Sequence, residues 1–169
     1  QIKLDISYNK NKVILVSANG PFEYNKLGPT HHCSADVPLL NLLPDIDIYL
    51  PGRDFEVIDS LDRIANSQNA AYLRLNNKAA NHLEVTPNEI VYNSDILNIF
   101  IGETINKLDE YKQDSYLYLY NINDFNACDI KSFKIINVFE PYSSPILGSK
   151  IKLRHKDKNI NLKYYPKSI

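Results

Sequence analysis

Short apolar runs alternate along the chain with segments of helical periodicity, and this alternation constrains the fold more than any other feature. Residues 13–16 read Val-Ile-Leu-Val, and strand-like stretches return at 46–50 and 71–75, with a helical pattern at 54–65 between them. Strands that alternate with helices are typical of βαβ units, whose strands pair in parallel. The run at 13–16 suits a strand buried on both faces. The sequence therefore predicts an α/β fold with mainly parallel sheets.

The same alternation resumes in the second half of the chain. Further strands are predicted at 96–101, 116–120, 133–139 and 160–164, and a further helix around 105–111. Residues 76–94 have little periodicity and contain several Asn and a Pro, which is typical of a connecting segment. We therefore expect two α/β pieces, at 1–80 and 92–169, joined by a linker at 81–91. The pattern at 2–6 fits either a strand or the end of a helix.

Composition excludes several classes of function. The 19 basic residues are balanced by 20 acidic ones, for a net charge of −1, which argues against nucleic-acid binding. No stretch approaches the roughly 18 consecutive apolar residues of a membrane helix, so we expect a soluble, cytoplasmic chain without a membrane partner. The chain begins at Gln1 and contains no Met. We therefore expect it to be a fragment of a longer polypeptide.

One dense cluster of reactive side chains, Gly-Pro-Thr-His-His-Cys-Ser-Ala-Asp at 28–36, follows the apolar run at 13–16. Ligands of open α/β sheets bind at the carboxyl ends of strands, and histidine is the side chain most easily tuned near neutral pH. The cluster is therefore a candidate ligand-binding or catalytic loop. A purely structural interpretation stays open, because Thr30 and Asp36 can cap a helix that begins near Ser34.

Metal binding and cysteine chemistry are less favoured interpretations of this loop. The adjacent His31 and His32 point apart on an extended segment, and no Cys, Asp or Glu lies at a spacing that completes a tetrahedral set. Cys33 and a neighbouring histidine rarely reach each other as nucleophile and base. The sequence therefore predicts no metal site within this chain.

Arg74 is the second candidate, because it lies inside an otherwise apolar strand at 71–75. A buried guanidinium without a partner is costly, so this side chain either reaches the surface or meets an anion. Its planar fork suits a phosphate or a carboxylate. Arg53 and Arg63, by contrast, flank a helix that we expect to be solvated, and they need no functional explanation.

The order of the motifs resembles that of the transketolase family. In the first half the resemblance is carried by Gly-Pro-Thr-His at 28–31, Leu-Pro at 43–44 and Leu-Arg-Leu at 73–75, which match the second part of the family's pyrimidine-binding domain. In the second half it is carried by the strand at 94–102 and by Phe-Glu-Pro-Tyr at 139–142, which are similar to the family's C-terminal domain. The expected fold is therefore a truncated pyrimidine-binding domain followed by a transketolase C-terminal-like domain.

The resemblance implies a thiamine diphosphate site shared between polypeptides and used for two-carbon ketol transfer between sugar phosphates. His31 would contact cofactor and substrate as the catalytic residue, and Arg74 would bind the sugar phosphate bidentately. The diphosphate, with Mg²⁺ or Ca²⁺, would be held by a diphosphate-binding N-terminal domain or subunit that this chain lacks. The resemblance thus implies a dimeric assembly, and the isolated chain is expected to be inactive.

Three departures from the family pattern keep other functions open. Asn19 stands where many transketolases have a histidine, Leu27 replaces an aspartate before the Gly-Pro-Thr-His motif, and the family's cofactor-activating glutamate is expected before Gln1. An apolar Leu27 offers no acceptor to a substrate hydroxyl. The alternatives are a non-catalytic scaffold module, or part of a deoxyxylulose phosphate synthase-like or pyruvate dehydrogenase beta-like enzyme.

Overall fold

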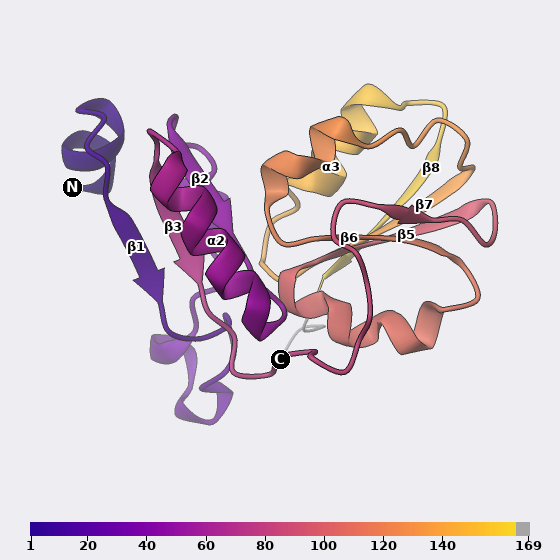
Figure 1. Cartoon of the computed structure of the whole chain (residues 1–169), viewed down its shortest axis with the longest axis horizontal. Helices are drawn as coiled ribbons and strands as arrows, with labels where there is room; N and C mark the ends of the chain where they lie inside the picture. Colours follow the sequence, from indigo (N-terminus) through magenta and orange to yellow (C-terminus); the bar gives the residue numbers. More distant parts are fainter. Residues whose placement is uncertain (165–169) are drawn as a thin grey trace.

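The computed structural model describes residues 1–164, which form two sheets that lie side by side (Figure 1). The first sheet has the order β1 (Ile14–Ser17), β3 (Ala70–Arg74), β2 (Ile46–Tyr49), and all its strands are parallel. The second has the order β4 (Ile90–Val91), β6 (Ser115–Leu119), β5 (Ile96–Ile101), β7 (Ile135–Glu140), β8 (Asn159–Tyr164). Only β4, antiparallel to β6, departs from parallel pairing among these strands. The predicted α/β fold with mainly parallel sheets is confirmed.

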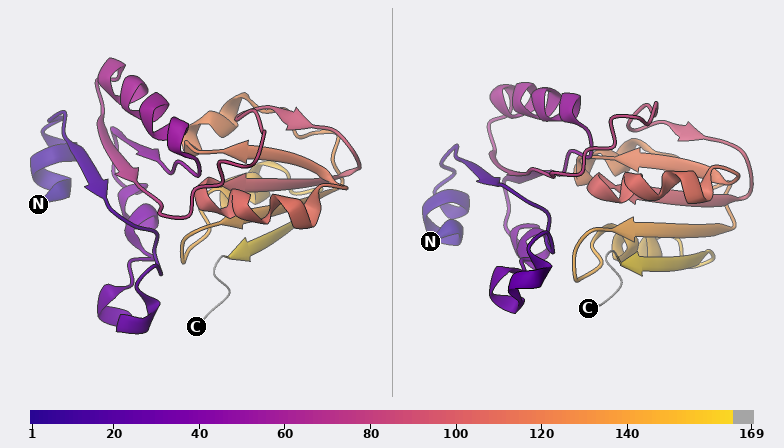
Figure 2. Two further views of the ribbon diagram at one scale, coloured as in Figure 1. Left: turned by 60° about the horizontal axis from the view of Figure 1, so that its bottom comes forward. Right: turned by 90° about the horizontal axis from the view of Figure 1, so that it is seen from below.

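Helices cover both faces of each sheet (Figure 2). The helical segments are η1 (Ile2–Tyr8), η2 (Asn25–Leu27), η3 (Pro29–His31), α1 (Asp36–Leu40), α2 (Asp54–Asn66), η4 (Gly102–Tyr111), η5 (Ile122–Ala127) and α3 (Leu147–Arg154). Two apolar cores result, because α1 and α3 pack with one set of alternating strand residues, and α2 and η4 pack with the other. The undecided segment at 2–6 is helical. Residues 165–169 of the predicted second piece lie outside the described residues.

The prediction that the 13–16 run is buried on both faces is wrong. Its strand, β1, forms an edge of the first sheet and pairs only with β3 among the described strands. Ile14 is 45% exposed and Val16 59% exposed. A Val-Ile-Leu-Val run fits a buried central strand and an uncovered edge strand equally well, so the pattern alone could not place it.

The two sheets meet at the carboxyl ends of their strands. Directly after β2, the Leu50 amide donates to the Tyr120 carbonyl after β6, at 2.6 Å. Gly102, which follows β5, has φ +55°, and a Cβ there would lie 2.7 Å from the Leu50 carbonyl oxygen. A side chain at Gly102 would therefore force the sheets apart. This junction gathers the strand ends where α/β proteins carry their sites.

A row of asparagines crosses the second sheet and yields a first testable prediction. Asn161 donates to Asn137 (3.1 Å), and Asn137 donates to the fully buried Asn98 (2.8 Å). Replacing Asn137 with alanine leaves the side-chain oxygen of Asn98 without that donor. The free energy of unfolding, measured by urea denaturation, should therefore fall by about 1–3 kcal/mol. The half-buried Asn161, replaced in the same way, should cost less. Equal losses would contradict this explanation.

Candidate functional site

Arg74, the last residue of β3, lies at the junction and is only 3% exposed. One terminal nitrogen, Nη1, donates to both carboxylate oxygens of Asp36, at 3.2 and 3.3 Å. The other, Nη2, donates to the carbonyl oxygen of Pro141 at 3.0 Å, directly after β7. The guanidinium thus meets an anion, as a buried arginine requires, and it also ties the first sheet to the second.

Asp36 is a second member of this cluster, and its role differs from the predicted one. It is the first residue of α1, and its carboxylate accepts from the Tyr72 hydroxyl at 2.6 Å as well as from Arg74. No side-chain cap hydrogen bond is present at this helix start. The structural interpretation in which Asp36 caps the helix is therefore wrong. Burial, with the hydrogen bond to Asp36, raises the pKa of Tyr72, so the phenol stays protonated.

Glu103 reaches the same region from the second sheet. It follows Gly102 at the carboxyl end of β5, and a Cβ placed on Gly20 would lie 2.5 Å from its carboxylate oxygen Oε2. Burial raises the pKa of Glu103, and the nearby positive charges of Arg74 and Lys78 partly offset this effect. A half-buried carboxylate of raised pKa beside an arginine can accept or release a proton nearer neutral pH than an exposed one.

The raised pKa of Glu103 yields a pH prediction. Because the folded-state pKa lies above the ordinary value of 4.5, the folded protein binds this proton more tightly than the unfolded chain does. Stability should therefore fall as pH rises from about 4.5 through the folded pKa. Glu103→Gln should flatten the pH dependence of the urea midpoint in this window, whereas Glu84→Gln, at an exposed position, should not. Parallel curves for Glu103→Gln and the unmodified chain would argue against it.

Glu140, the last residue of β7, is a second buried carboxylate near the junction, only 1% exposed. Its Oε1 accepts from the Tyr142 hydroxyl and from the backbone amides of Ile146 and Leu147, at 2.7–3.0 Å. Burial raises the pKa of Glu140, and these hydrogen bonds oppose the increase. The carboxylate therefore accepts hydrogen bonds from the first backbone amides of α3 and caps this helix from inside the fold.

Asp36 of the loop at 28–36 joins this cluster, but the two histidines of the loop do not. His31 ends η3 and is exposed, and its ring contacts Thr30 (3.0 Å to Nδ1) and the ring of Tyr24. The ring of His32 packs edge-on against Phe22, and its Nε2 is buried without a partner among the described residues. Within residues 1–164, no hydrogen bond or ring contact joins His31 to Arg74. Their assignment as catalytic and phosphate-binding residues stays a prediction.

Arg53 is buried, so the prediction that it merely flanks a solvated helix is wrong. Its guanidinium donates to Glu56 through Nε (2.8 Å) and Nη2 (2.6 Å), and through Nη1 to the Leu83 carbonyl. The other oxygen of Glu56 accepts from Tyr118 on β6 and from the amides of Gly52 and Arg53. This ion pair thus joins α2 to the second sheet.

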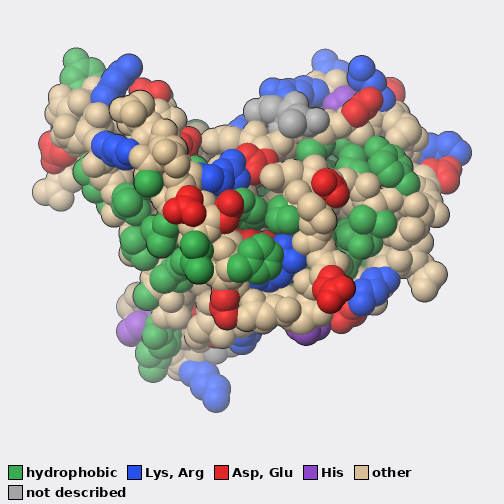
Figure 3. All heavy atoms as spheres, in the orientation of Figure 1, with side chains coloured by type: hydrophobic (Ala, Val, Ile, Leu, Met, Phe, Trp, Pro, Cys, Tyr) green, Lys and Arg blue, Asp and Glu red, His purple; other side chains and the backbone are tan. Residues whose placement is uncertain are grey.

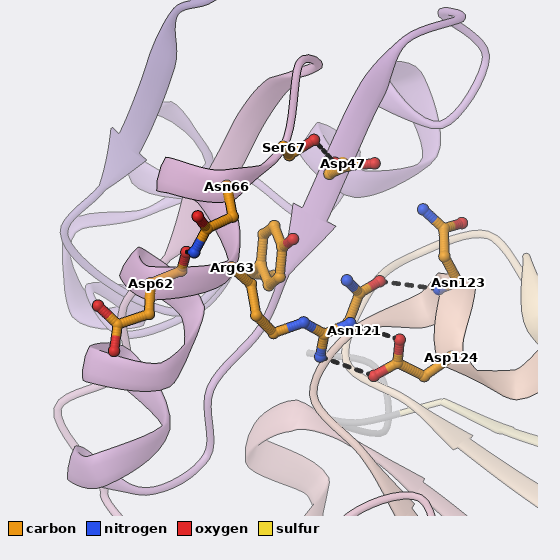
Figure 4. Close-up of a pocket in the computed structure, with 9 residues that line it drawn as sticks. Asp47, Asp62, Arg63, Asn66, Ser67, Asn121, Asn123 and Asp124 are labelled. Carbon is orange, nitrogen blue, oxygen red and sulfur yellow. Dashed lines mark hydrogen bonds and ion pairs between the residues drawn. The ribbon is translucent and has the colours of Figure 1, made fainter.

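Arg63 has a defined partner in the structure. It lines an open pocket of about 520 Å³ between α2 and η5, and its two terminal nitrogens bind the Asp124 carboxylate at 2.8 and 2.6 Å (Figure 4). In the same pocket Ser67 donates to Asp47. The polar groups of this pocket thus largely satisfy one another, which indicates a structural contact between the two halves.

Metal-binding clusters and membrane-spanning helices are both absent from the described part of the chain. Residues 1–164 contain no group of three or more His, Cys, Asp or Glu side chains placed to hold a metal ion. None of the helices in this range has the length and apolar character that crossing a bilayer requires.

No protein-family model matches the sequence. Two curated proteins, each named as a subunit of an apulose-4-phosphate transketolase, are similar to it. The one from Phocaeicola vulgatus is 37% identical over 51 residues, which are 30% of this chain and 16% of that protein. The one from Actinobacillus succinogenes is 31% identical over 78 residues, which are 46% of this chain and 25% of that protein. The matched stretch thus spans a quarter or less of these relatives.

Solved structures extend the likeness over nearly the whole chain. A split-gene transketolase, described as an inactive beta4 tetramer, has a TM-score of 0.76 at 14% identity, and the match covers 96% of this chain and 60% of that one. The chain is transketolase-like in sequence and fold. A transketolase from Campylobacter jejuni has a TM-score of 0.69 at 13% identity, and the match covers 94% of this chain and 27% of that one. The resemblance predicted from the motifs is confirmed.

Two residues of the junction, Asp36 and Glu103, were not identified as site residues from the sequence. Asp36 is 38 positions from Arg74, and its place at the start of α1 made it look like a helix cap. Glu103 belongs to the other sheet, and it had no motif of its own in the sequence. A useful signal was the apolar setting of Arg74, which required an anion somewhere in the chain or in a ligand.

Proposed function

We propose that this transketolase-like chain supplies part of a thiamine diphosphate-dependent site for two-carbon ketol transfer between sugar phosphates. The observation that carries the proposal is the sequence similarity to proteins named as transketolase subunits, together with the shared fold. The word subunit in those names implies that the relatives work with a further polypeptide. We propose the same arrangement here, with the diphosphate and its metal held by a polypeptide other than this chain.

We propose that the described residues supply only a share of such a site. Residues 1–164 contain no cluster of His, Cys, Asp or Glu placed to hold a metal ion, which supports the proposal that the metal is held by another polypeptide. His31 is exposed on the loop after β1 and is available to a group carried by a partner. Arg74 would have to release Asp36 before it could bind a substrate phosphate bidentately. We propose residues 1–80 and 92–169 as the two structural parts, with 81–91 between them.

The proposal predicts activity only in a completed assembly. The chain is mixed with a subunit that carries a transketolase diphosphate-binding domain, thiamine diphosphate and Mg²⁺, and ketol transfer from a sugar phosphate is measured. His31→Ala should lower the rate by about 100-fold or more if the imidazole moves a proton. His82→Ala is the matched control, because His82 is also an exposed histidine, and its ring lies beside Asp109 on η4. The isolated chain should bind thiamine diphosphate with a Kd weaker than about 1 μM.

A non-catalytic scaffold function is the second candidate. The pairing of Arg74 with Asp36 and Pro141 favours it, since the guanidinium already has partners in the fold. The exposed Leu27 also offers a substrate no hydrogen bond. Activity of the reconstituted assembly that is unchanged by His31→Ala would favour the scaffold.

A further inference from the structure

The outward face of α2 carries a row of apolar side chains. Phe55, Ile58 and Leu61 follow one another at intervals of three residues and are 55%, 66% and 44% exposed. Ala65 continues the row one turn later and is also exposed. Figure 3 shows hydrophobic side chains beside acidic ones on the face of the molecule on which α2 lies, seen in the orientation of Figure 1.

This arrangement inverts the usual pattern of a surface helix. The buried residues of α2 are Glu56, Ser60 and Ile64, so two of the three inward positions are polar. Surface helices of globular proteins normally turn their apolar residues to the core and their polar residues to water. A contiguous exposed apolar row typically marks a binding surface. Side chains at intervals of three and four residues are the pattern that another helix recognises.

Charge defines what this surface can bind. Three carboxylates, those of Asp54, Asp59 and Asp62, are exposed on the same helix. Of the two arginines at its start and along it, Arg53 is buried and paired with Glu56, with its guanidinium over the Phe55 ring, and Arg63 is paired with Asp124. The side of the apolar row that carries these aspartates is therefore negative, whereas the Lys12 ammonium, which donates to the Ala65 carbonyl at 2.8 Å, lies at the Ala65 end.

We propose that α2 binds an amphipathic helix of a different polypeptide, one with an apolar stripe flanked by Lys or Arg. The stripe covers Phe55, Ile58 and Leu61, and the basic flanks meet the aspartates. Electrostatic complementarity of this kind sets the choice of partner and the rate of association. This inference does not depend on ketol transfer, because the binding is measured directly.

A second copy of the chain is a poorer occupant of this surface. Packing α2 against α2 would set Asp54 and Asp62 of one copy near the same residues of the other, and like charges repel. The basic helix α3 exposes one large apolar side chain, Leu153. A contact between α2 and α3 would also be heterologous, and such contacts close only for particular rotations.

Peptide binding to the full chain tests the proposal. The probes are two fluorescent helical peptides with the same leucine stripe, one flanked by lysines and one by glutamates, titrated in fluorescence anisotropy. The lysine peptide should bind at least about tenfold more tightly than the glutamate peptide, and added salt should narrow the gap. Ile58→Glu should weaken binding of the lysine peptide about tenfold or more, and Asp62→Lys should shift the preference toward the glutamate peptide.

Leu153→Glu is the matched control, because it changes a similarly exposed aliphatic side chain on α3. It should leave binding unchanged. Equal affinity for the two peptides, or equal effects of Ile58→Glu and Leu153→Glu, would overturn the proposal. Sedimentation equilibrium covers the remaining case: self-association of the chain that Ile58→Glu abolishes would identify a second copy as the occupant and would also overturn it.

Discussion

Replacing Glu56 with glutamine should lower the free energy of unfolding by about 3–5 kcal/mol, the cost of removing one member of a buried ion pair. The side chains of Arg53 and Glu56 are 2% and 0% exposed. Glutamine keeps the shape of glutamate but removes its charge, so the guanidinium stays buried without an anion. Its amide nitrogen would also point N–H groups toward either Arg53 or the Tyr118 hydroxyl, which are both donors.

Urea denaturation followed by circular dichroism measures this loss. Glu84→Gln is the control, because Glu84 is an exposed glutamate close in sequence to Leu83, whose carbonyl accepts from Arg53. That substitution should change stability by no more than about 0.5 kcal/mol. Tyr118→Phe removes one of the hydrogen bonds to Glu56 and should give an intermediate loss. A Glu56→Gln variant as stable as the control would mean that the pair does not hold the two sheets together.

Apart from β4 (Ile90–Val91), which lies in the segment predicted as a linker, the strands were predictable because each is a short apolar run between breakers. The predicted run at 71–75 became β3 at Ala70–Arg74, and the run at 96–101 became β5 at Ile96–Ile101. Which side of helix α2 faces the core was not predictable in this way. Its apolar residues recur at three and four, as expected, but Ile58 and Leu61 face outward. Periodicity locates a helix and its apolar face, and it does not show what covers that face.

The site was only partly predictable, for a related reason. The sequence indicated that Arg74 needs an anion, and the structure supplies one in Asp36. Which carboxylate fills that role depends on how α1 packs at the end of β3, which no local pattern encodes. Glu103 comes from the other sheet, so its position depends on how the two sheets meet. Residues brought together by the junction were therefore the ones that the sequence alone could not identify.

Asp36→Asn should lower the free energy of unfolding by about 3–5 kcal/mol as well, since it leaves Arg74 as a buried cation without its carboxylate. The side chains of Arg74 and Asp36 are 3% and 8% exposed, so water screens this pair weakly. Asparagine can still accept from Tyr72, and the neutral substitution therefore isolates the loss of charge. Urea denaturation at neutral pH measures the effect.

Stabilisation by inorganic phosphate distinguishes the two possible functions of Arg74, phosphate binding and the joining of the two sheets. If Arg74 is a phosphate-binding residue held by Asp36, inorganic phosphate should stabilise Asp36→Asn more than it stabilises the unmodified chain, because the anion replaces the missing carboxylate. Stabilisation by a ligand grows as RT ln(1 + [L]/Kd), which is about 2.7 kcal/mol at 100 times Kd. The double variant Asp36→Asn, Arg74→Gln should lose this response. If phosphate stabilises all three proteins equally, Arg74 serves to join the two sheets, and the scaffold function is favoured.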